Sequence, residues 1–350
     1  MKNLFKTKTY LGIDINQNGI RLMELKPGRT PEVLGYGSID LPRSKVVNSL
    51  ENSDSYLEDK LSDLIKNKLI GKISSHYIAI SIPTAQTFSR IIRLPKEAEK
   101  DISSTIDLEI EQYIPVPKDL LEIDYSVISR TNKNIEVLLC ATPKNIVRRA
   151  IEVSRSAKLE PVLIEPSMNS IARLLYKNEA GYLRTIVLDI GLTGTDIAVL
   201  DKFIKATSST QIGGNNFTLS IANSMKITVE KAHQLKLLKG FNKSPEQKSI
   251  AKALEPDMKS LINEVRKLIR YYEERLDGQP VEQIIITGVG SNVAGLGDYF
   301  TNELYLPVRL ANPWQDINFK HITRPKRIFI SRYLTVAGVA LADQKEVVSS

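Results

Sequence analysis

Two stretches of the sequence, half a chain apart, place an aspartate at the end of an apolar strand, just before a tight polar turn. Residues 10–25 read YLGIDINQNGIRLMEL, and residues 185–200 read TIVLDIGLTGTDIAVL. The two aspartates, Asp14 and Asp189, are 175 positions apart in a chain of 350 residues. Turns rich in glycine and small polar residues direct several backbone N–H groups into one concavity, which suits phosphate oxygens. The pattern therefore predicts two phosphate-binding hairpins.

The carboxylates beside these turns predict a cation. Two carboxylates near a polyphosphate require a positive charge between them, and Mg²⁺ binds in such places while it keeps most of its waters. Asp14 and Asp189 are therefore candidates to bind Mg²⁺ through water. Either hairpin alone is more simply a turn with a capping aspartate, but the matched pair favours phosphate binding. The candidate phosphate-binding residues are Asn16, Gln17, Asn18, Gly19 and Arg21 in the first hairpin, and Gly191, Leu192, Thr193 and Gly194 in the second.

Three further motifs predict the rest of a nucleotide site. In IIITGVGSNVAGL, glycines after a buried strand let the backbone pass close to a base or ribose, and the following helix start favours anionic groups. In QIGGNNFT, two glycines precede a helix, which serves a hinge or the close approach of a ligand. Glu230 and His233 share one face of an expected helix and could both reach a ribose, although two solvated side chains explain the pair equally well. The candidates from the first two motifs are Gly288, Val289, Gly290, Ser291, Gly213, Gly214 and Asn215.

The elements that must position these residues alternate between strands and helices, which indicates an α/β protein with mixed sheets. Three successive strands joined by turns begin the chain, and the same order recurs after residue 184. The expected strands are 10–16, 19–26, 32–41, 77–82, 87–94, 123–130, 135–141, 162–164, 185–190, 196–200, 203–209 and 281–287. The expected helices are 55–69, 97–113, 143–157, 166–176, 215–225, 228–239, 257–276 and 333–342, with a polar connector over 242–256.

Composition and charge exclude several other classes of protein. A chain of 350 residues is too long for one compact core, and a single cysteine excludes a disulfide scaffold or a thiolate metal cage. No uncharged apolar run is long enough to span a bilayer, and the start lacks the apolar core of a signal peptide, so we expect a cytosolic protein. The net charge of +8 is mild. The basic stretch 320–332 has no accompanying nucleic-acid-binding motif, so we expect no nucleic-acid partner.

In this order, the motifs resemble those of the actin-like ATPase fold: two phosphate loops, an adenosine motif and two connecting helices. The segment IEPSMNSIARLL resembles the first connecting helix. TVAGVAL resembles the second, where Ala337, Gly338 and Ala340 would let helices approach closely at a hinge. The resemblance implies an α/β fold of two duplicated, ribonuclease H-like lobes around a nucleotide cleft. It also implies ATP and Mg²⁺ as cofactors, with Glu165 in the position that orients the attacking water.

Finer details are similar to the PilM family of type IV pilus assembly proteins. LEIEQYIPVP at residues 108–117, LEPDMKSLINEVRKLIRYYEER and ANPWQDI carry this resemblance, which spans about residues 9–342. It implies a cytoplasmic ATP-binding scaffold with at most slow ATPase activity, recruited peripherally to the inner membrane through its partners. The implied partners are the N-terminal cytoplasmic peptide of the inner-membrane protein PilN, held in a groove beside an inserted subdomain, and other inner-membrane pilus assembly proteins. A homo-oligomer is also compatible with the resemblance.

The resemblance implies four subdomains as well. The core of the first lobe, 1A, would comprise residues 9–75 and 158–183, and the inserted peptide-binding subdomain, 1C, would comprise residues 76–157. The core of the second lobe, 2A, would comprise residues 184–215 and 281–345, and the helical subdomain, 2B, residues 216–280.

The chain departs from the family pattern in its first turn. This turn is commonly rich in Ser and Thr, but here it reads Asn16-Gln17-Asn18-Gly19, with Arg21 where a lysine is common. Arginine is a rigid fork and lysine a point charge, so the exchange matters if the side chain contacts phosphate.

Three alternatives share the core fold. An FtsA-like division protein would be expected to end in an amphipathic membrane helix, whereas the tail ALADQKEVVSS has no apolar stripe. A sugar or acid kinase needs an aspartate base and a pocket for the phosphoryl acceptor, for which the sequence shows no candidate, although analogy of fold does not decide function. A cytoplasmic domain of a type II secretion protein would continue into a transmembrane helix, which we do not find.

Overall fold

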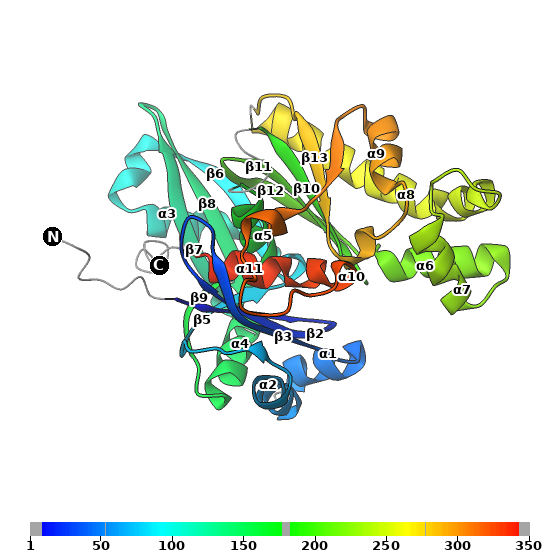
Figure 1. Ribbon diagram of the computed structural model, residues 1–350. Coiled ribbons are helices and arrows are strands. Elements are labelled where there is room, and N and C mark those ends of the chain that lie inside the picture. The colour runs from blue at the N-terminus through cyan, green and yellow to red at the C-terminus, as the bar shows by residue number, and fades with distance from the viewer. Residues whose placement is uncertain (1–8, 53, 177–182, 277, 343–350) are drawn as a thin grey trace. The chain divides into compact units, whose positions relative to one another are not determined.

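The computed structural model describes residues 9–52, 54–176, 183–276 and 278–342, drawn as ribbons in Figure 1. The chain forms two compact units. Unit 1 combines Met1–Ser170, Ile317–Thr323 and Thr335–Ser350, and unit 2 combines Ile171–Asp316 and Arg324–Leu334. Two of the crossings between the units lie within helices, α5 (Ser167–Leu175) and α11 (Leu334–Ala340).

Unit 1 contains a six-stranded sheet covered on one face by helices α1 (Arg43–Asn52), α2 (Tyr56–Asn67) and α4 (Lys144–Ser156) (Figure 1). In spatial order its strands are β4 (Ile70–Gly71), β3 (Glu32–Asp40), β2 (Gly19–Lys26), β1 (Leu11–Asn16), β5 (Tyr77–Ile82) and β9 (Glu160–Pro166). Strands β1, β2 and β3 form an antiparallel meander, and β5 and β9 continue the sheet parallel to β1. Alternate residues of β1, Leu11, Ile13 and Ile15, face the three helices and form the buried core with them.

The opposite face of this sheet packs against α11. A Cβ on Gly12 of β1 would clash with the carbonyl oxygen of Val336, so the bare glycine lets the helix lie directly on the strand. Helix α11 also touches α5, because a Cβ on Gly338 would clash with the carbonyl oxygen of Ser170. The expectation that small residues let the two connecting helices approach closely is confirmed at Gly338.

Three further strands of unit 1, β6 (Phe88–Pro95), β8 (Asn134–Pro143) and β7 (Leu121–Arg130), pair antiparallel with one another, with β8 in the middle. Helix α3 (Ile102–Tyr113) buries Ile106 and Ile110 in the core of this module. The expected inserted subdomain, 76–157, also includes β5 and α4. In the structure β5 lies between β1 and β9, and Ala150 and Val153 of α4 complete the core of the six-stranded sheet instead.

Unit 2 repeats the strand pattern of the six-stranded sheet. In spatial order its strands are β12 (Phe203–Thr210), β11 (Thr195–Asp201), β10 (Thr185–Ile190), β13 (Gln283–Thr287) and β14 (Val308–Leu310). As in unit 1, an antiparallel meander of three strands is followed by two strands parallel to the first. The order β12-β11-β10-β13-β14 thus matches β3-β2-β1-β5-β9 strand for strand. The duplication predicted from the two hairpins is therefore confirmed for the surrounding sheets.

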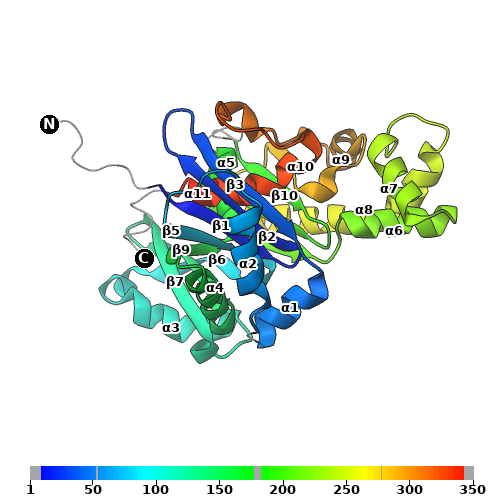
Figure 2. The same cartoon turned by 60° about the horizontal axis from the view of Figure 1, so that its bottom comes forward.

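In unit 2, helix α6 (Gly214–Met225) packs against both α7 (Val229–Leu238) and α8 (Gln247–Arg270) (Figure 2). Helix α9 (Leu296–Leu304) and the short α10 (Arg327–Ile330) follow in the chain. Helix α8 begins at Gln247 rather than at residue 257, and it contains Pro256. Proline inside a helix removes one backbone hydrogen bond and crowds the preceding turn. Ile250 and Leu254 are buried in the same core as the rest of α8, and their packing offsets this cost.

Helices α3 and α1 also differ from the expectation. The single helix expected over 97–113 is a 3₁₀ turn, Lys96–Lys100, followed by α3. Asp101 separates the two, because its side chain accepts the backbone N–H of Ser104 at 3.0 Å and caps α3. Helix α1 was not expected, since it buries only Val46 and Ser49 and so lacks an apolar stripe. Within the described ranges, every helix is too short or too polar to cross a membrane.

Candidate functional site

The first predicted phosphate turn joins β1 to β2. Asp14 faces Arg21 across the two strands, and Asn16 faces Gly19. The Asn16 side chain shapes the turn: its Oδ1 accepts the backbone N–H of Asn18 at 2.9 Å, and its Nδ2 donates to Asp14 Oδ2 at 2.6 Å. Gly19 has φ +138°, and a Cβ there would clash with the backbone of β3, so this position requires glycine.

Asp14 and Arg21 form a buried ion pair. Arg21 Nη1 lies 3.9 Å from Asp14 Oδ2, and Arg21 Nη2 donates to Asp40 Oδ1 at 3.3 Å. Arg21 and Asp14 are 5% and 4% exposed. Burial raises the pKa of Asp14 to about 6, although the nearby Arg21 and the hydrogen bond from Asn16 both lower it. The first hairpin therefore already holds a positive charge beside its aspartate.

The second hairpin gathers glycines from three separate segments. A Cβ on Gly213 would lie 2.7 Å from the amide N of Gly194, and one on Gly214 would lie 2.8 Å from the Cα of Gly290. A Cβ on Gly290 would clash with the carbonyl oxygen of Gly191. The predicted glycines of the β10–β11 turn, of the start of α6 and of the segment after β13 therefore meet at one place. We call Gly191, Gly194, Gly213, Gly214 and Gly290 the glycine cradle.

Hydrogen bonds fix the shape of the glycine cradle and leave part of it open. The N–H groups of Gly214 and Asn215 donate to the carbonyl oxygens of Gly191 and Leu192, both at 2.9 Å, and so tie the start of α6 to the turn. The three N–H groups of residues 192–194 donate to no acceptor among the residues that the structure describes. Consecutive unpaired N–H groups in a turn form a nest for an anion.

Asp189 lies at the end of β10, next to the glycine cradle. It faces Asp196 on β11 and Thr287 on β13. Gly288 follows with φ +87°, and a Cβ there would clash with Asp189 Oδ1, so the carboxylate rests against bare backbone. Asp196 accepts a hydrogen bond from Ser209 Oγ at 2.5 Å, and burial raises the pKa of Asp196. Two carboxylates therefore face each other where the first hairpin has a carboxylate and a guanidinium.

The two hairpins belong to matching polar rows that run across the two sheets. In unit 1 the laterally paired residues, from β3 to β9, are Ser38, Arg21, Asp14, Ser81 and Glu165. In unit 2 the paired residues, from β12 to β13, are Ser209, Asp196, Asp189 and Thr287. The hydroxyl oxygens of Ser81 and Thr287 are both buried without a hydrogen-bond partner in the described part of the chain. Over the positions that the two rows share, they differ in charge at one position, which Arg21 occupies in unit 1 and Asp196 occupies in unit 2.

Glu165, the expected water-orienting residue, ends the row in unit 1. It is buried, and its Oε1 accepts a hydrogen bond from Ser170 Oγ at 2.6 Å. Thr84 Oγ1 accepts the backbone N–H of Met168 at 2.9 Å, which fixes the start of α5 immediately after Glu165. The carboxylate is therefore held on a rigid backbone.

Two residues of α7, Glu230 and His233, are candidates from the sequence, and a third residue of this helix, Lys236, is not among them. Glu230 and His233 are exposed, and burial together with the nearby Lys236 lowers the pKa of His233. Lys236 is 4% exposed, and its Nζ donates to the carbonyl oxygen of Gly214 and to Thr218 Oγ1, both at 2.8 Å. Burial lowers the pKa of Lys236 to about 8. Lys236 follows the buried Ala232 by four residues and so lies on the same face of α7. This spacing is the sequence pattern that could have indicated a buried lysine.

These residues fit a nucleotide and its metal unequally. The glycine cradle has N–H groups without acceptors in the described part of the chain and a nearby ammonium, which are donors of the kind that phosphate oxygens accept from. In the described residues no group of three or more His, Cys, Asp or Glu side chains could hold a metal ion. A divalent cation would therefore need phosphate oxygens and water as ligands, as Mg²⁺ commonly does. Asp189 has a second carboxylate, Asp196, on the neighbouring strand, whereas Asp14 has the Arg21 guanidinium there.

The sequence matches the family model described as type IV pilus assembly protein PilM over residues 12–344. The chain belongs to the PilM family. Among solved structures, a chain of a PilM-PilN type IV pilus biogenesis complex is 21% identical, with a TM-score of 0.78, and the match covers 98% of this chain and 99% of that chain. Family membership favours the pilus interpretation over the FtsA-like and kinase alternatives.

Two other solved structures show the same fold at lower similarity. The ethanolamine utilization protein EutJ from Carboxydothermus hydrogenoformans is 18% identical, with a TM-score of 0.54, over 97% of this chain and 91% of that chain. MreB5 of Spiroplasma citri bound to ADP is 13% identical, with a TM-score of 0.51, over 98% of both chains. The expected actin-like ATPase fold, with its duplicated α/β core, is confirmed.

Proposed function

We propose that the protein is an ATP-binding scaffold of type IV pilus assembly that also binds the N-terminal cytoplasmic peptide of a PilN-type inner-membrane protein. The glycine cradle is the observation that carries the nucleotide half of this proposal. It combines three unpaired N–H groups in one turn with the buried ammonium of Lys236. A site that is built from backbone donors and one cation recognises phosphate without regard to the rest of the ligand.

In this proposal the phosphates of ATP lie at the glycine cradle. The segment Gly288–Ser291 passes beside the base or ribose, and Glu230 and His233 contact the ribose from α7. The first turn, residues 16–19, is a second candidate for phosphate binding. Glu165 orients the water for slow hydrolysis, because its carboxylate is buried and held by Ser170.

Mg²⁺ would supply positive charge to the phosphates when bound. We propose that the carboxylates of Asp189 and Asp196, which lie on neighbouring strands, hold the Mg²⁺ ion through water. Asp14 is the other carboxylate that the sequence predicts near Mg²⁺, and it differs from Asp189 in that it forms a buried ion pair with Arg21.

The partner half of the proposal is supported by family membership and by the likeness to a chain of the PilM-PilN complex. In unit 1, β7 is the edge strand beside β8, and an edge strand accepts an extended peptide through backbone hydrogen bonds. Leu108, Val116 and Leu120 expose apolar side chains on and next to α3 in the same module. Binding of the PilN-type peptide would recruit the protein to the inner membrane, where other pilus assembly proteins and further copies of this chain are the remaining proposed partners.

Calorimetric titration with ATP and Mg²⁺ tests the nucleotide half. Lys236→Met should weaken binding at least about tenfold, which corresponds to about 1.4 kcal/mol, because it removes the cation at the glycine cradle. Lys231→Met is the matched control, since Lys231 is exposed on the same helix and should leave the affinity within about twofold. Equal affinities for both variants would contradict the assignment of the phosphate site.

A separate titration tests the partner half. A labelled synthetic peptide with the N-terminal sequence of the PilN-type protein from the same genome should bind the full chain, and a scrambled peptide of equal charge should not. If ATP binds and neither peptide does, the partner half fails while the nucleotide half stands.

A further inference from the structure

Arg21 is the place where the two polar rows differ in charge. Asp14 in unit 1 faces Arg21, whereas its counterpart in unit 2, Asp189, faces Asp196. The neighbouring positions match, because each aspartate has a serine or threonine with a buried, unpartnered hydroxyl on the parallel strand beside it, within the described residues. The duplicated sheets therefore hold their aspartates in the same backbone setting, with a guanidinium on the cross-strand neighbour in unit 1 and a carboxylate on the cross-strand neighbour in unit 2.

The Arg21 guanidinium is held between two carboxylates. Its Nη1 is 3.9 Å from Asp14 Oδ2, and its Nη2 is 3.3 Å from Asp40 Oδ1. Asn16 Nδ2 donates to the same Asp14 oxygen at 2.6 Å. A metal ion that approached this oxygen would meet one cation and one N–H donor already directed at it. Like charges in a buried site repel strongly, because little water is present to screen them.

We propose that Arg21 is the built-in counter-ion of Asp14, so that the first hairpin binds no divalent cation and the second hairpin alone holds the cation that accompanies the nucleotide. Arg21 is then a positioning residue that acts through Asp14, not a substitute for a phosphate-binding lysine. The role of the second hairpin rests on the proposed nucleotide-binding function. The pairing of Arg21 with Asp14 does not, and it is tested without nucleotide.

The first experiment measures the midpoint of thermal unfolding of the full chain in EDTA and in millimolar Mg²⁺, without nucleotide. Arg21→Met removes the guanidinium beside the buried Asp14 carboxylate and opens this carboxylate to a metal ion. Mg²⁺ should therefore raise the midpoint of this variant by several degrees, and that of the wild type and of Arg21→Lys by less than about 1 °C. The same Mg²⁺ response in all three proteins would overturn the proposal.

The double variant Asp14→Asn/Arg21→Met keeps the proposal testable if Arg21→Met is too unstable to fold. It removes both charges of the buried pair, so it should unfold at a higher temperature than Arg21→Met and should show no Mg²⁺ response. A double variant that is no more stable than Arg21→Met would show that the two charges are not coupled, which would also overturn the proposal.

The second experiment separates the two hairpins. The affinity for a fluorescent ATP analogue is measured with Mg²⁺ and with EDTA, and the ratio of the two affinities is compared between variants. Asp189→Asn should lower this ratio at least about tenfold, whereas Asp14→Asn should change it less than about twofold. A fall in Asp14→Asn as large as in Asp189→Asn would place Asp14 at the metal and overturn the proposal. If the wild type binds no analogue, the proposed function fails, and the thermal measurement alone decides the role of Arg21.

Discussion

Gly338 in α11 and Ser170 in α5 meet backbone to backbone, because a Cβ at residue 338 would overlap the carbonyl oxygen of Ser170. Both residues belong to unit 1, and both helices cross into unit 2. The point where the connecting helices touch is therefore also the point where a side chain of any size is excluded. A contact of this kind restricts how far the two helices can slide past each other.

Gly338→Ala should destabilise the protein by about 1–3 kcal/mol, because the added methyl forces the backbones of α5 and α11 apart. Gly28→Ala is the matched control: a Cβ there would lie 3.6 Å from its nearest neighbour and needs no rearrangement. The measurement is urea unfolding of both variants. A cost at Gly338 no larger than that at Gly28 would mean that the helix contact is easily relaxed.

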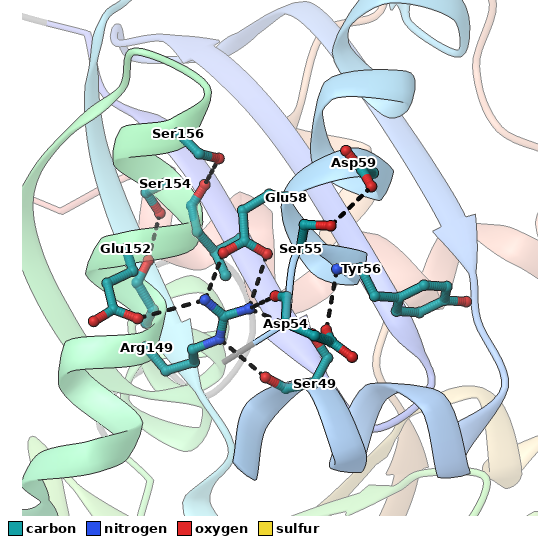
Figure 3. Close-up of polar contacts among 12 residues, drawn as sticks. Ser49, Asp54, Ser55, Tyr56, Glu58, Asp59, Arg149, Glu152, Ser154 and Ser156 are labelled. Atoms are coloured by element: carbon teal, nitrogen blue, oxygen red, sulfur yellow. Dashed lines mark hydrogen bonds and ion pairs between the residues drawn. The ribbon is translucent and has the colours of Figure 1, made fainter. Parts of the chain in front are cut away.

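Arg149 of α4 ties together the three helices that cover the six-stranded sheet (Figure 3). Its guanidinium makes a two-point contact with Glu58 of α2, donates from Nε to the Ser49 carbonyl oxygen of α1 at 3.0 Å, and also reaches the Asp54 carbonyl oxygen. The side chain is 3% exposed. Arg149→Met should cost about 3–5 kcal/mol of unfolding free energy, since it removes a buried guanidinium and leaves the largely buried Glu58 carboxylate without its partner.

Its neighbour Arg148 provides the control for this prediction. Arg148 is 72% exposed and pairs with Glu152 one turn along the same helix. Arg148→Met should therefore cost less than about 0.5 kcal/mol. Denaturant titration of the two variants tests the difference, and similar costs would show that the Arg149 cluster contributes no more than a surface ion pair.

Lys236 makes stability depend on pH in the alkaline range. Its pKa is lowered by burial from 10.5 to about 8, so the folded protein releases this proton at a lower pH than the unfolded chain. The unfolding free energy should therefore rise with pH between about 8 and 10.5, by at most about 1.4 kcal/mol per pH unit, relative to Lys236→Met. Below pH 8 the difference between the two proteins should be constant. Parallel stability curves across the whole range would mean that Lys236 keeps its proton when folded.

The same proton controls ATP binding in our proposal. Because the glycine cradle uses the charge of Lys236, the affinity of the wild type for ATP should fall as the pH rises above 8, while that of Lys236→Met should stay level. Calorimetric titrations at pH 7 and pH 9 compare the two proteins.

Substitution of Ser81 tests whether its hydroxyl, in the polar row of unit 1, contributes to stability. Its hydroxyl is fully buried and has no partner among the described residues, whereas Ser170 Oγ donates to Glu165. Ser81→Ala should leave the unfolding free energy unchanged or raise it by up to about 1 kcal/mol, and Ser170→Ala should lower it by about 1–3 kcal/mol. If the two variants lose equal stability, Ser81 is bonded in solution, for example to a buried water.

Much of the fold was predictable because the signals were local or repeated. An apolar strand, an Asp-Ile pair and a tight turn mark both hairpins, and the structure builds the same five-strand order around each. The glycines at 191, 213 and 290 were also predictable as close-approach points, since few other residues suit them. Their convergence into one cradle follows from the strand order.

The parts that were not predictable depend on contacts between distant segments. Pro256 breaks the local helix pattern, and only the burial of Ile250 and Leu254 in the core of unit 2 explains why α8 continues through it. Lys236 looks like an ordinary helix-surface lysine until α6 is packed beside it. The pairing of Arg21 with Asp14 and Asp40 depends on the register of β1, β2 and β3, which local sequence patterns do not specify.

A crystal structure of the full chain grown with a non-hydrolysable ATP analogue and Mg²⁺ is the most direct test of the central claim, that the glycine cradle binds nucleotide phosphate. We expect phosphate oxygens within hydrogen-bond distance of the N–H groups of residues 192–194, with the Lys236 ammonium nearby. An analogue bound elsewhere, or a well-ordered cradle that stays empty at saturating analogue, would contradict it.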